Sequence, residues 1–336
     1  MGRLNVMLTA VFSVNSWLYI ALAIVLVVLV LLVIDTIRRY QYKKARAEKR
    51  AKRRRQQENG KTAAAGAAAE QTASANEVTI IGNIADIPKA PVSAAYFQDI
   101  GARDDQQDSY GMTDVGQYSQ YGVMAVVADG MGGLANGKAV SSALVRTFVE
   151  GFGVVAAYAK CSDALLDLAI RANEQINRML QGQERSGSTL VTALIKGGML
   201  YFLTVGDSRL YLYRGGALLQ LNREHIYQEE LAVKAVNRQV SIQQVSGDRQ
   251  SQSLTSYFGI GKIPCIDRNH EGIKLLPGDR LLLSSDGVFG TLSQEQMEQA
   301  LSLPLQEAAQ TLGNMVREAE KPYQDNNTGL ILEYQG

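Results

Sequence analysis

Short apolar runs separated by glycine, aspartate and asparagine make up much of the chain after residue 77. Each run is rich in leucine, valine, isoleucine or tyrosine, and its length and punctuation are typical of a buried strand. Several runs follow one another with only a few residues between them, which favours antiparallel hairpins. The runs are VMAVVADG, TLVTALIKGG, MLYFLTVGDS, RLYLYRGG, DRLLLSSDG and TGLILEY.

Two longer stretches, 138–152 and 163–180, carry apolar residues at helical spacing and lie between groups of these strands. The apolar stripe along 164–180 is expected to pack into a core, because one apolar face is typical of a surface helix. Runs of strands with helices segregated between them predict an α+β layered sandwich.

A different pattern occurs near the amino terminus, where every residue of 17–34 is apolar or aromatic. As a helix this segment would be about 27 Å long, close to the hydrocarbon thickness of a bilayer. Trp17 and Tyr19 stand at one end, where amphipathic rings favour the membrane interface. A cleaved signal peptide would carry its basic residues before the apolar run, and a buried globular helix would show a polar face. The segment therefore predicts a single transmembrane helix after a short flank, 1–16.

Basic residues crowd immediately after this segment, in the juxtamembrane stretch 35–55. The part that reads RRYQYKKARAEKRAKRRR holds eleven lysines and arginines and one acid, Glu48. Such an excess holds the carboxyl-terminal side in the cytoplasm, so we expect a single-pass protein of the inner (cytoplasmic) membrane. The same cluster could contact anionic lipid headgroups, although topology is its expected main role. Residues 56–77 have the composition of a linker, and 78–336 form one globular domain.

Composition excludes several classes of function. The formal net charge is +1, so no overall field favours nucleic acid, which is not an expected partner. The chain contains two cysteines, Cys161 and Cys265, too few for a disulfide framework in a domain of this size. With only two histidines, no Cys/His zinc site is expected. Neither cysteine lies in a glycine-rich, arginine-terminated anion-binding turn, and the spacing of a Walker loop is absent.

Aspartates stand where the apolar runs begin or end, often beside glycine. Carboxylates at the ends of buried strands are costly unless a positive charge compensates them, and a neighbouring glycine lets a carbonyl approach an ion. Oxygen-only ligand sets suit Mg²⁺ or Mn²⁺. One Asp-Gly pair alone is ordinary turn chemistry, but five aspartates in this order favour a metal site. The positions are Asp108, Asp129-Gly130, Gly206-Asp207, Asp286-Gly287 and Asp325.

In this order the motifs resemble the protein phosphatase 2C-like, metal-dependent (PPM) Ser/Thr phosphatases over nearly all of residues 93–336. The DGMGG form is more similar to the bacterial branch than to the animal one. The resemblance implies a β-sandwich of two antiparallel sheets flanked by helices. The motifs are GARDDQQDSYG, VVADGMGG, SGSTLVTALI, VGDSRLYLY, LNREH, LTSYFG, GDRLLLSSDGVFG and DNNTGLIL.

The resemblance also implies two Mn²⁺ or Mg²⁺ ions, with a third, weaker one, and a bridging water that attacks phosphorus in line. Asp129 would bridge the two ions, and Asp108 would hold the second ion largely through its waters. The carbonyl of Gly130 binds one ion, Asp286 and Asp325 complete the shell of the other, Asp207 helps to hold the third, and Arg103 grips the substrate phosphate.

Four positions depart from the common family pattern. Gln107 stands where many relatives carry glutamate, and Met131 where animal relatives have a histidine proposed as general acid. Glu224 replaces an aspartate and Ser256 a basic residue. These changes bear on substrate preference more than on chemistry. His225 is interpreted as a packed structural residue rather than a proton-transfer group.

The expected function is hydrolysis of phosphoserine and phosphothreonine in cytoplasmic or membrane-associated proteins. A natural partner would be a membrane-associated Ser/Thr kinase whose phosphorylations the enzyme reverses. An alternative is a catalytically silent module that binds phosphoproteins, suggested by Gln107. A third interpretation, an intracellular switch similar to the sporulation phosphatases, differs in substrate rather than in chemistry.

Overall fold

The computed structural model describes residues 79–80, 91–132, 136–156, 160–181 and 186–336. All of them belong to one compact unit, Ser74–Gly336. The predicted flank 1–16, transmembrane helix 17–34, basic segment 35–55 and linker 56–77 lie outside the described residues. Within the described ranges, no helix is both long enough and apolar enough to cross a bilayer.

Two sheets form the centre of the domain, and a third, two-stranded sheet lies beside them. Every pairing is antiparallel except that of β1 with β3. In sheet one the order is β1 (Thr79–Ile80), β3 (Ser109–Met112), β4 (Val123–Ala128), β7 (Leu190–Lys196), β8 (Met199–Val205) and β11 (Asp267–Arg268), with β12 (Ile273–Lys274) also on β8. In sheet two it is β10 (Ala217–Gln220), β9 (Arg209–Arg214), β13 (Arg280–Ser284), β14 (Asn327–Tyr334) and β2 (Val92–Asp99); the small sheet pairs β5 (Gly130–Met131) with β6 (Gly187–Ser188).

Strand β4 shows why the apolar runs become central strands. All six of its residues are buried, which is expected of a strand covered on both faces. Met124 and Val126 face the helix layer of sheet one, whereas Ala125 and Val127 face sheet two, since side chains alternate along a strand. The continuous apolar run therefore supplies two faces, and each face packs against one neighbouring layer.

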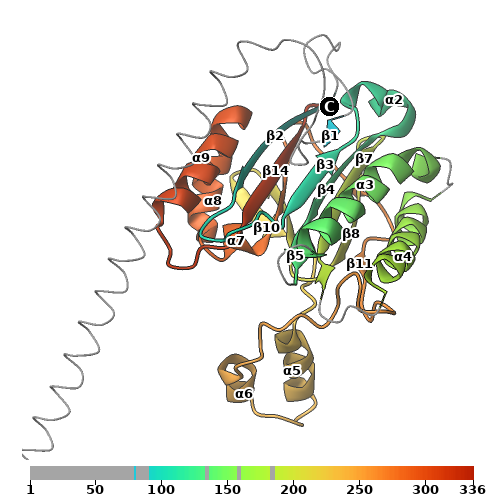
Figure 1. Cartoon of the computed structure of the whole chain (residues 1–336). Helices are drawn as coiled ribbons and strands as arrows, with labels where there is room; N and C mark the ends of the chain where they lie inside the picture. Colours follow the sequence, from blue (N-terminus) through green and yellow to red (C-terminus); the bar gives the residue numbers. More distant parts are fainter. Residues whose placement is uncertain (1–78, 81–90, 133–135, 157–159, 182–185) are drawn as a thin grey trace, which may run out of the picture. The chain divides into compact units, whose positions relative to one another are not determined.

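Helices cover the outer face of each sheet, which gives four layers (Figure 1). Helices α3 (Asn136–Ala156) and α4 (Cys161–Leu180) pack on sheet one, and α8 (Gln294–Leu301) and α9 (Leu305–Glu318) pack on sheet two. The predicted α+β sandwich of two sheets flanked by helices is confirmed for the described domain. Both predicted helices exist and are longer than expected. Further short helices are η2 (Val115–Gln117), α2 (Tyr118–Tyr121) and α7 (Asp286–Phe289).

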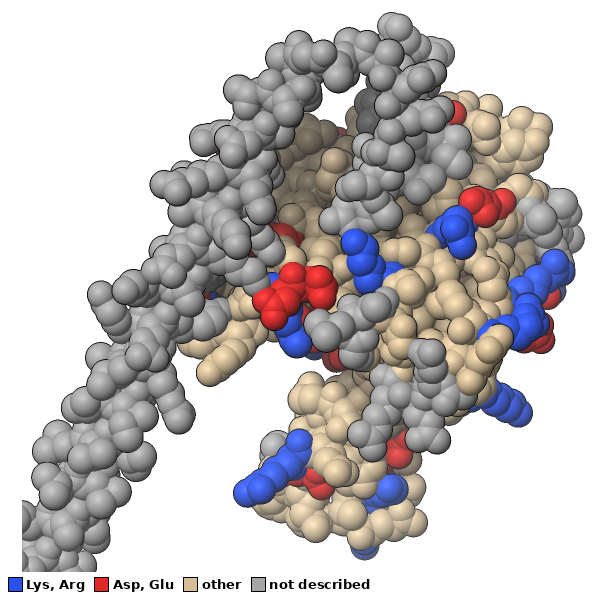
Figure 2. Space-filling view, viewed as in Figure 1, with Lys and Arg blue, Asp and Glu red and all other residues tan. Residues whose placement is uncertain are grey.

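A helical hairpin made of α5 (Tyr227–Val236) and α6 (Ile242–Gly247) stands apart from the layers (Figure 1). A single β-bridge, Ile226 with Leu254, closes its base. Leu231 is buried within the hairpin, whereas Val236 and Ile242 are 84% and 77% exposed. Figure 2 shows lysine or arginine and aspartate or glutamate side chains side by side on this hairpin. Its base brings Leu254 to the edge of the pocket described next.

Candidate active site

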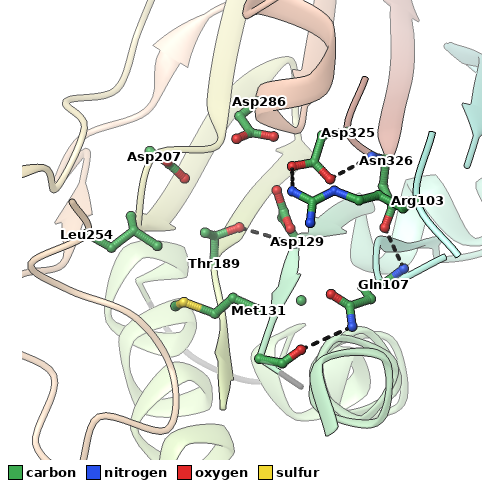
Figure 3. A pocket seen from close by; sticks show the side chains of 12 residues that line it. Arg103, Gln107, Asp129, Met131, Thr189, Asp207, Leu254, Asp286, Asp325 and Asn326 are labelled. Carbon is green, nitrogen blue, oxygen red and sulfur yellow. Dashed lines mark hydrogen bonds and ion pairs between the residues drawn. The ribbon is translucent and has the colours of Figure 1, made fainter. Parts of the chain in front are cut away.

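A pocket of about 230 Å³ lies where the ends of several strands meet (Figure 3). Asp129 directly follows β4, Asp207 follows β8 by two residues, and Asp286 follows β13 and opens α7. Asp325 lies two residues before β14, in which Gly329 pairs with Ser284, the last residue of β13. The antiparallel order therefore gathers residues that are far apart in the chain. The lining residues are Arg103, Gln107, Asp129, Gly130, Met131, Gly132, Thr189, Asp207, Leu254, Asp286, Asp325 and Asn326.

The backbone of Asp129 is fixed without the use of its carboxylate. Its N–H donates to the hydroxyl of Thr189 (3.1 Å), and its carbonyl accepts from the N–H of Thr189 (2.9 Å) and the hydroxyl of Ser188 (2.8 Å). Desolvation, and then the charge of Asp108, raise the pKa of Asp129 well above its usual value. The backbone is therefore held independently of the carboxylate, and a cation bound to the carboxylate would relieve this cost.

Asp207 is positioned by His225, which hydrogen-bonds the backbone of the preceding residue, Gly206. The ring nitrogen Nδ1 of His225 accepts a hydrogen bond from the backbone N–H of Gly206 (3.0 Å), and the backbone N–H of His225 donates to the Gly206 carbonyl (2.9 Å). Desolvation lowers the pKa of His225, so it stays neutral as this hydrogen bond requires. These contacts agree with the structural interpretation of His225. Desolvation and the charge of Asp286 raise the pKa of Asp207 to about 7.

Arg103 lies beside Asp325, 2.5 Å from its Oδ2, and its side chain is 58% exposed. The two loops touch because Gly101 has φ of +62° and the site of its missing Cβ lies 2.2 Å from the carbonyl oxygen of Asp325. The N–H of Ala102 donates to the Gln324 carbonyl (2.7 Å) and closes the contact. Figure 3 shows Arg103 between Asp325 and Asp129, with its guanidinium toward the carboxylates. An exposed cationic side chain is thus paired with an acid at the rim of the pocket.

Asp108 lies behind the pocket lining and is only 4% exposed. Desolvation raises its pKa to about 7, against the opposing effect of hydrogen bonds from Ser285 and Thr328. Its charge is the largest electrostatic influence on the pKa of Asp129. The sequence-based set is therefore brought together, with Asp108 buried one layer deeper than the other acids.

Gly130 has no room for a side chain. A Cβ there would lie 2.3 Å from the Gly137 carbonyl oxygen and 2.7 Å from that of Gln107. We expect Gly130→Ala to lower the free energy of unfolding by about 1–3 kcal/mol, because backbone must move to admit the methyl group. Chemical denaturation measures this. Gly153→Ala is the matched control, since a Cβ at the exposed Gly153 of α3 meets nothing within 4 Å. Equal effects of the two substitutions would contradict the steric argument.

Two of the four departures from the family pattern line the pocket. The Gln107 side chain donates to the Gly132 carbonyl (3.2 Å), and Met131 lies opposite the acids near Leu254 (Figure 3). The other two have structural partners. Glu224 pairs with Arg209 (2.7 Å), and the buried hydroxyl of Ser256 donates to the Cys265 carbonyl (2.6 Å).

The donor set fits a hard divalent cation. The pocket offers carboxylate, amide and carbonyl oxygens, which Mg²⁺ and Mn²⁺ prefer. One oxygen of Asp108 and one of Asp286 are buried with no hydrogen-bond partner among the described residues. Among the residues that the structure describes, no three aspartate, glutamate, histidine or cysteine side chains are close enough together in their present positions to hold one ion. The arrangement is therefore a shared acidic pocket whose carboxylates must adjust on binding.

Sequence reasoning did not single out Thr189, Leu254 or Asn326 as pocket residues. Thr189 carries no charge, and its role is to hold the backbone of Asp129. The amide of Asn326 accepts from the N–H of Gln107 (2.8 Å) and donates to the carbonyls of Ile100 and Asp105. Asn326 and Thr189 both lie inside conspicuous motifs, which was the available signal. Leu254 opens the motif LTSYFG, but an apolar residue there carries no chemistry that points to a pocket, and the bridge to Ile226 holds it in place.

Comparisons with known proteins agree with this geometry. A family model described as protein phosphatase 2C matches residues 100–321. The serine/threonine protein phosphatase PstP of Mycobacterium tuberculosis is 28% identical over 221 residues, 62% of this chain and 40% of that relative. The chain thus spans 40% of the length of the curated relatives that it matches first.

Solved structures share the fold. The PPM Ser-Thr phosphatase MsPP of Mycobacterium smegmatis, in complex with cacodylate, is 29% identical with a TM-score of 0.58 and covers 73% of this chain and 98% of its own. The catalytic domain of PstP in complex with 2 manganese ions is 23% identical with a TM-score of 0.57, over 73% of this chain and 99% of its own. At that identity the second likeness is one of fold alone.

Proposed function

Since this chain belongs to the protein phosphatase 2C family, we propose that it hydrolyses phosphoserine and phosphothreonine in other proteins with the help of Mn²⁺ or Mg²⁺. The observation that carries the proposal is the convergence of Asp129, Asp207, Asp286 and Asp325 with Arg103 on one pocket. A phosphomonoester is dianionic, so a site for it must supply positive charge. Arg103 supplies one such charge, and the cations would supply the rest.

Two bound ions would activate a water and neutralise the phosphoryl group, so no cysteine or serine nucleophile is needed. Asp129, Asp286, Asp325 and the carbonyl of Gly130 would hold these ions, with Asp108 behind them and Asp207 at a third ion. The chain's own groups orient the reactants. The guanidinium of Arg103 grips the phosphate through paired hydrogen bonds, and Met131 and Leu254 form an apolar side of the pocket.

The test of this function is Mn²⁺-dependent hydrolysis of p-nitrophenyl phosphate and of phosphoserine and phosphothreonine peptides by the purified full-length chain. We expect activity with Mn²⁺ that chelation abolishes. The alternative, a catalytically silent phosphoprotein-binding module, is motivated by Gln107 at the pocket in place of an acid. Phosphopeptide binding without turnover, measured by calorimetry on folded and metal-loaded protein, would favour that alternative.

Arg103→Ala should raise the KM for a phosphopeptide by about 10- to 100-fold, because a charge-assisted contact contributes roughly 1.5–3 kcal/mol. Steady-state kinetics with Mn²⁺ measures this. The same substitution at Arg171, an exposed residue of α4 that lies 2.7 Å from Asp167, should leave KM unchanged. An unaltered KM in Arg103→Ala would show that another group binds the phosphate.

We further propose that residues 17–34 anchor the enzyme in the inner membrane with its catalytic domain in the cytoplasm, where it opposes a membrane-associated Ser/Thr kinase. The support is the uniformly apolar segment and the basic cluster after it. Confinement to a surface raises the effective concentration toward substrates on that surface. The full-length chain should sediment with membranes, and a chain lacking residues 1–55 should not. Full-length protein in the soluble fraction would contradict the anchor.

A further inference from the structure

One buried carboxylate joins the two sheets at the pocket end. Asp108 immediately precedes β3 of sheet one, whereas Ser285 follows β13 and Thr328 lies in β14 of sheet two. Oδ2 of Asp108 accepts one hydrogen bond from the Ser285 hydroxyl (2.7 Å) and another from the Thr328 hydroxyl (2.7 Å). Both hydroxyl residues are 0% exposed. The carboxylate is therefore held by protein groups rather than by solvent.

Neighbouring donors fix the direction of both hydroxyl groups. The oxygen of Ser285 accepts from the N–H of Thr328 (3.0 Å). The oxygen of Thr328 accepts from the amide nitrogen of Gln98 (3.1 Å), which also donates to the Asp108 carbonyl (3.3 Å). A carbonyl can only accept, so the orientation of that amide is determined. Because each hydroxyl oxygen receives a hydrogen bond, its own hydrogen is directed to Oδ2 of Asp108.

The second oxygen of the same carboxylate is in the opposite situation. Oδ1 of Asp108 is buried and has no hydrogen-bond partner among the described residues. An unpaired buried acceptor on a carboxylate is costly, and in a native protein such a group calls for a bound ion or water as its partner. Carboxylates that bind metal ions are themselves oriented by hydrogen bonds, which are a large part of a metal site's affinity.

We propose that Ser285 and Thr328 are positioning residues, which occupy Oδ2 of Asp108 and leave Oδ1 for a divalent cation or its water. The inference rests on the proposed function, since it needs a cation at this pocket. It adds two uncharged residues of sheet two to a site described by its acids. It also gives a reason for the strand-end sequence Ser285-Asp286, in which one residue serves Asp108 and the next lines the pocket.

The test is titration of the full-length chain in detergent micelles with Mn²⁺ alone, followed by calorimetry. Thr328→Val removes the hydroxyl with little change of shape, and Ser285→Ala removes the other one. Each should weaken Mn²⁺ binding by about tenfold, and the double variant by up to about 100-fold. Thr328→Ser keeps the hydroxyl and should restore nearly the affinity of the unchanged protein, which a loss of packing alone would not explain.

Thr204→Val is the matched control. Thr204 is also 0% exposed and lies on a central strand, but its hydroxyl has no hydrogen-bond partner among the described residues. Its Mn²⁺ affinity should be unchanged. Unaltered affinity in Thr328→Val, equal losses in the two valine variants, or failure of Thr328→Ser to restore binding would each overturn the inference. The unchanged protein separates this inference from the proposed function. If it binds Mn²⁺ in the titration and hydrolyses phosphopeptides in the assay described above, the proposed function stands even when the inference about Ser285 and Thr328 fails. If it does neither, both fall together.

Discussion

Asp129→Asn should reduce Mn²⁺-dependent turnover on the order of 10³-fold, while the protein stays folded. The carboxylate of Asp129 would bridge the two cations, so a neutral amide removes the charge that both ions share. The local backbone should persist, because its hydrogen bonds to Ser188 and Thr189 involve only main-chain atoms of Asp129. Steady-state kinetics, circular dichroism and Mn²⁺ calorimetry on the same preparation measure the three effects.

The same substitution should stabilise the metal-free protein. Desolvation and the charges of Asp108 and Asp286 raise the pKa of Asp129, so its ionised form is disfavoured in the folded state. Asparagine has a similar shape and no charge, and the EDTA-treated variant should unfold at a higher temperature than the unchanged protein at pH 7.5. A loss of activity with a gain in stability separates a functional residue from a structural one.

Asp163→Asn serves as the comparison for both effects. Asp163 lies on α4, its side chain is 55% exposed, and it pairs with Arg268 at 2.9 Å. Its replacement should leave turnover unchanged and should not raise the unfolding temperature in EDTA. Turnover of Asp129→Asn within tenfold of the unchanged protein would remove Asp129 from the proposed metal bridge.

The central strands could be predicted because their burial on both faces produces continuous apolar runs. β4 and β7 are clear examples, with nearly every residue buried. The acids were predictable for a related reason, since a charged residue directly after such a run is conspicuous. The helices α5, α6, α8 and α9 were not predicted. Of these, α6 and α8 have only 6 and 8 residues and are defined by capping boxes from Ser241 and Ser293.

The uncharged part of the site could not be inferred in the same way. Ser285 and Thr328 act through hydrogen bonds to a residue more than 170 positions away, and no local pattern reports such a contact. Gln98 is the next-to-last residue of the edge strand β2, where a polar residue is ordinary. The depth of Asp108 was equally hidden, because GARDDQQD contains three aspartates and only the fold buries one of them.

The stability of the metal-free protein should fall as pH rises from 5 to 7.5. The folded-state pKa values of Asp108 and Asp207 are about 7, whereas an unfolded aspartate titrates near about 3.9. A raised pKa means that the folded state binds the proton more tightly. This contribution is fully present below the unfolded pKa and is lost as pH rises through the folded value. The pKa values of Asp129 and Asp286 shift in the same direction.

In EDTA we expect the unfolding midpoint to drop by about 5–10 °C across this interval, since about 1 kcal/mol shifts the midpoint of a domain of this size by 2–4 °C. His225 acts in the opposite sense, because its lowered pKa favours the neutral form and costs stability as pH falls. Only one histidine opposes four carboxyl groups, so the unfolding midpoint should still decrease as pH rises. Thermal unfolding followed by circular dichroism at several pH values measures it.

Saturating Mn²⁺ should reverse the sign of this slope. Cations bind the deprotonated carboxylates, so binding releases protons and strengthens as pH rises, and binding to the folded state alone raises the midpoint. Asp207→Asn removes one titrating group and should flatten the slope in EDTA, whereas Asp163→Asn should leave it unchanged, because the lowered pKa of Asp163 places its titration below this interval. Two results would contradict this prediction: an unfolding midpoint in EDTA that rises between pH 5 and 7.5, or the same slope for the metal-free and the Mn²⁺-loaded protein. Either would mean that these carboxylates do not form a cluster whose charge is neutralised by bound cations.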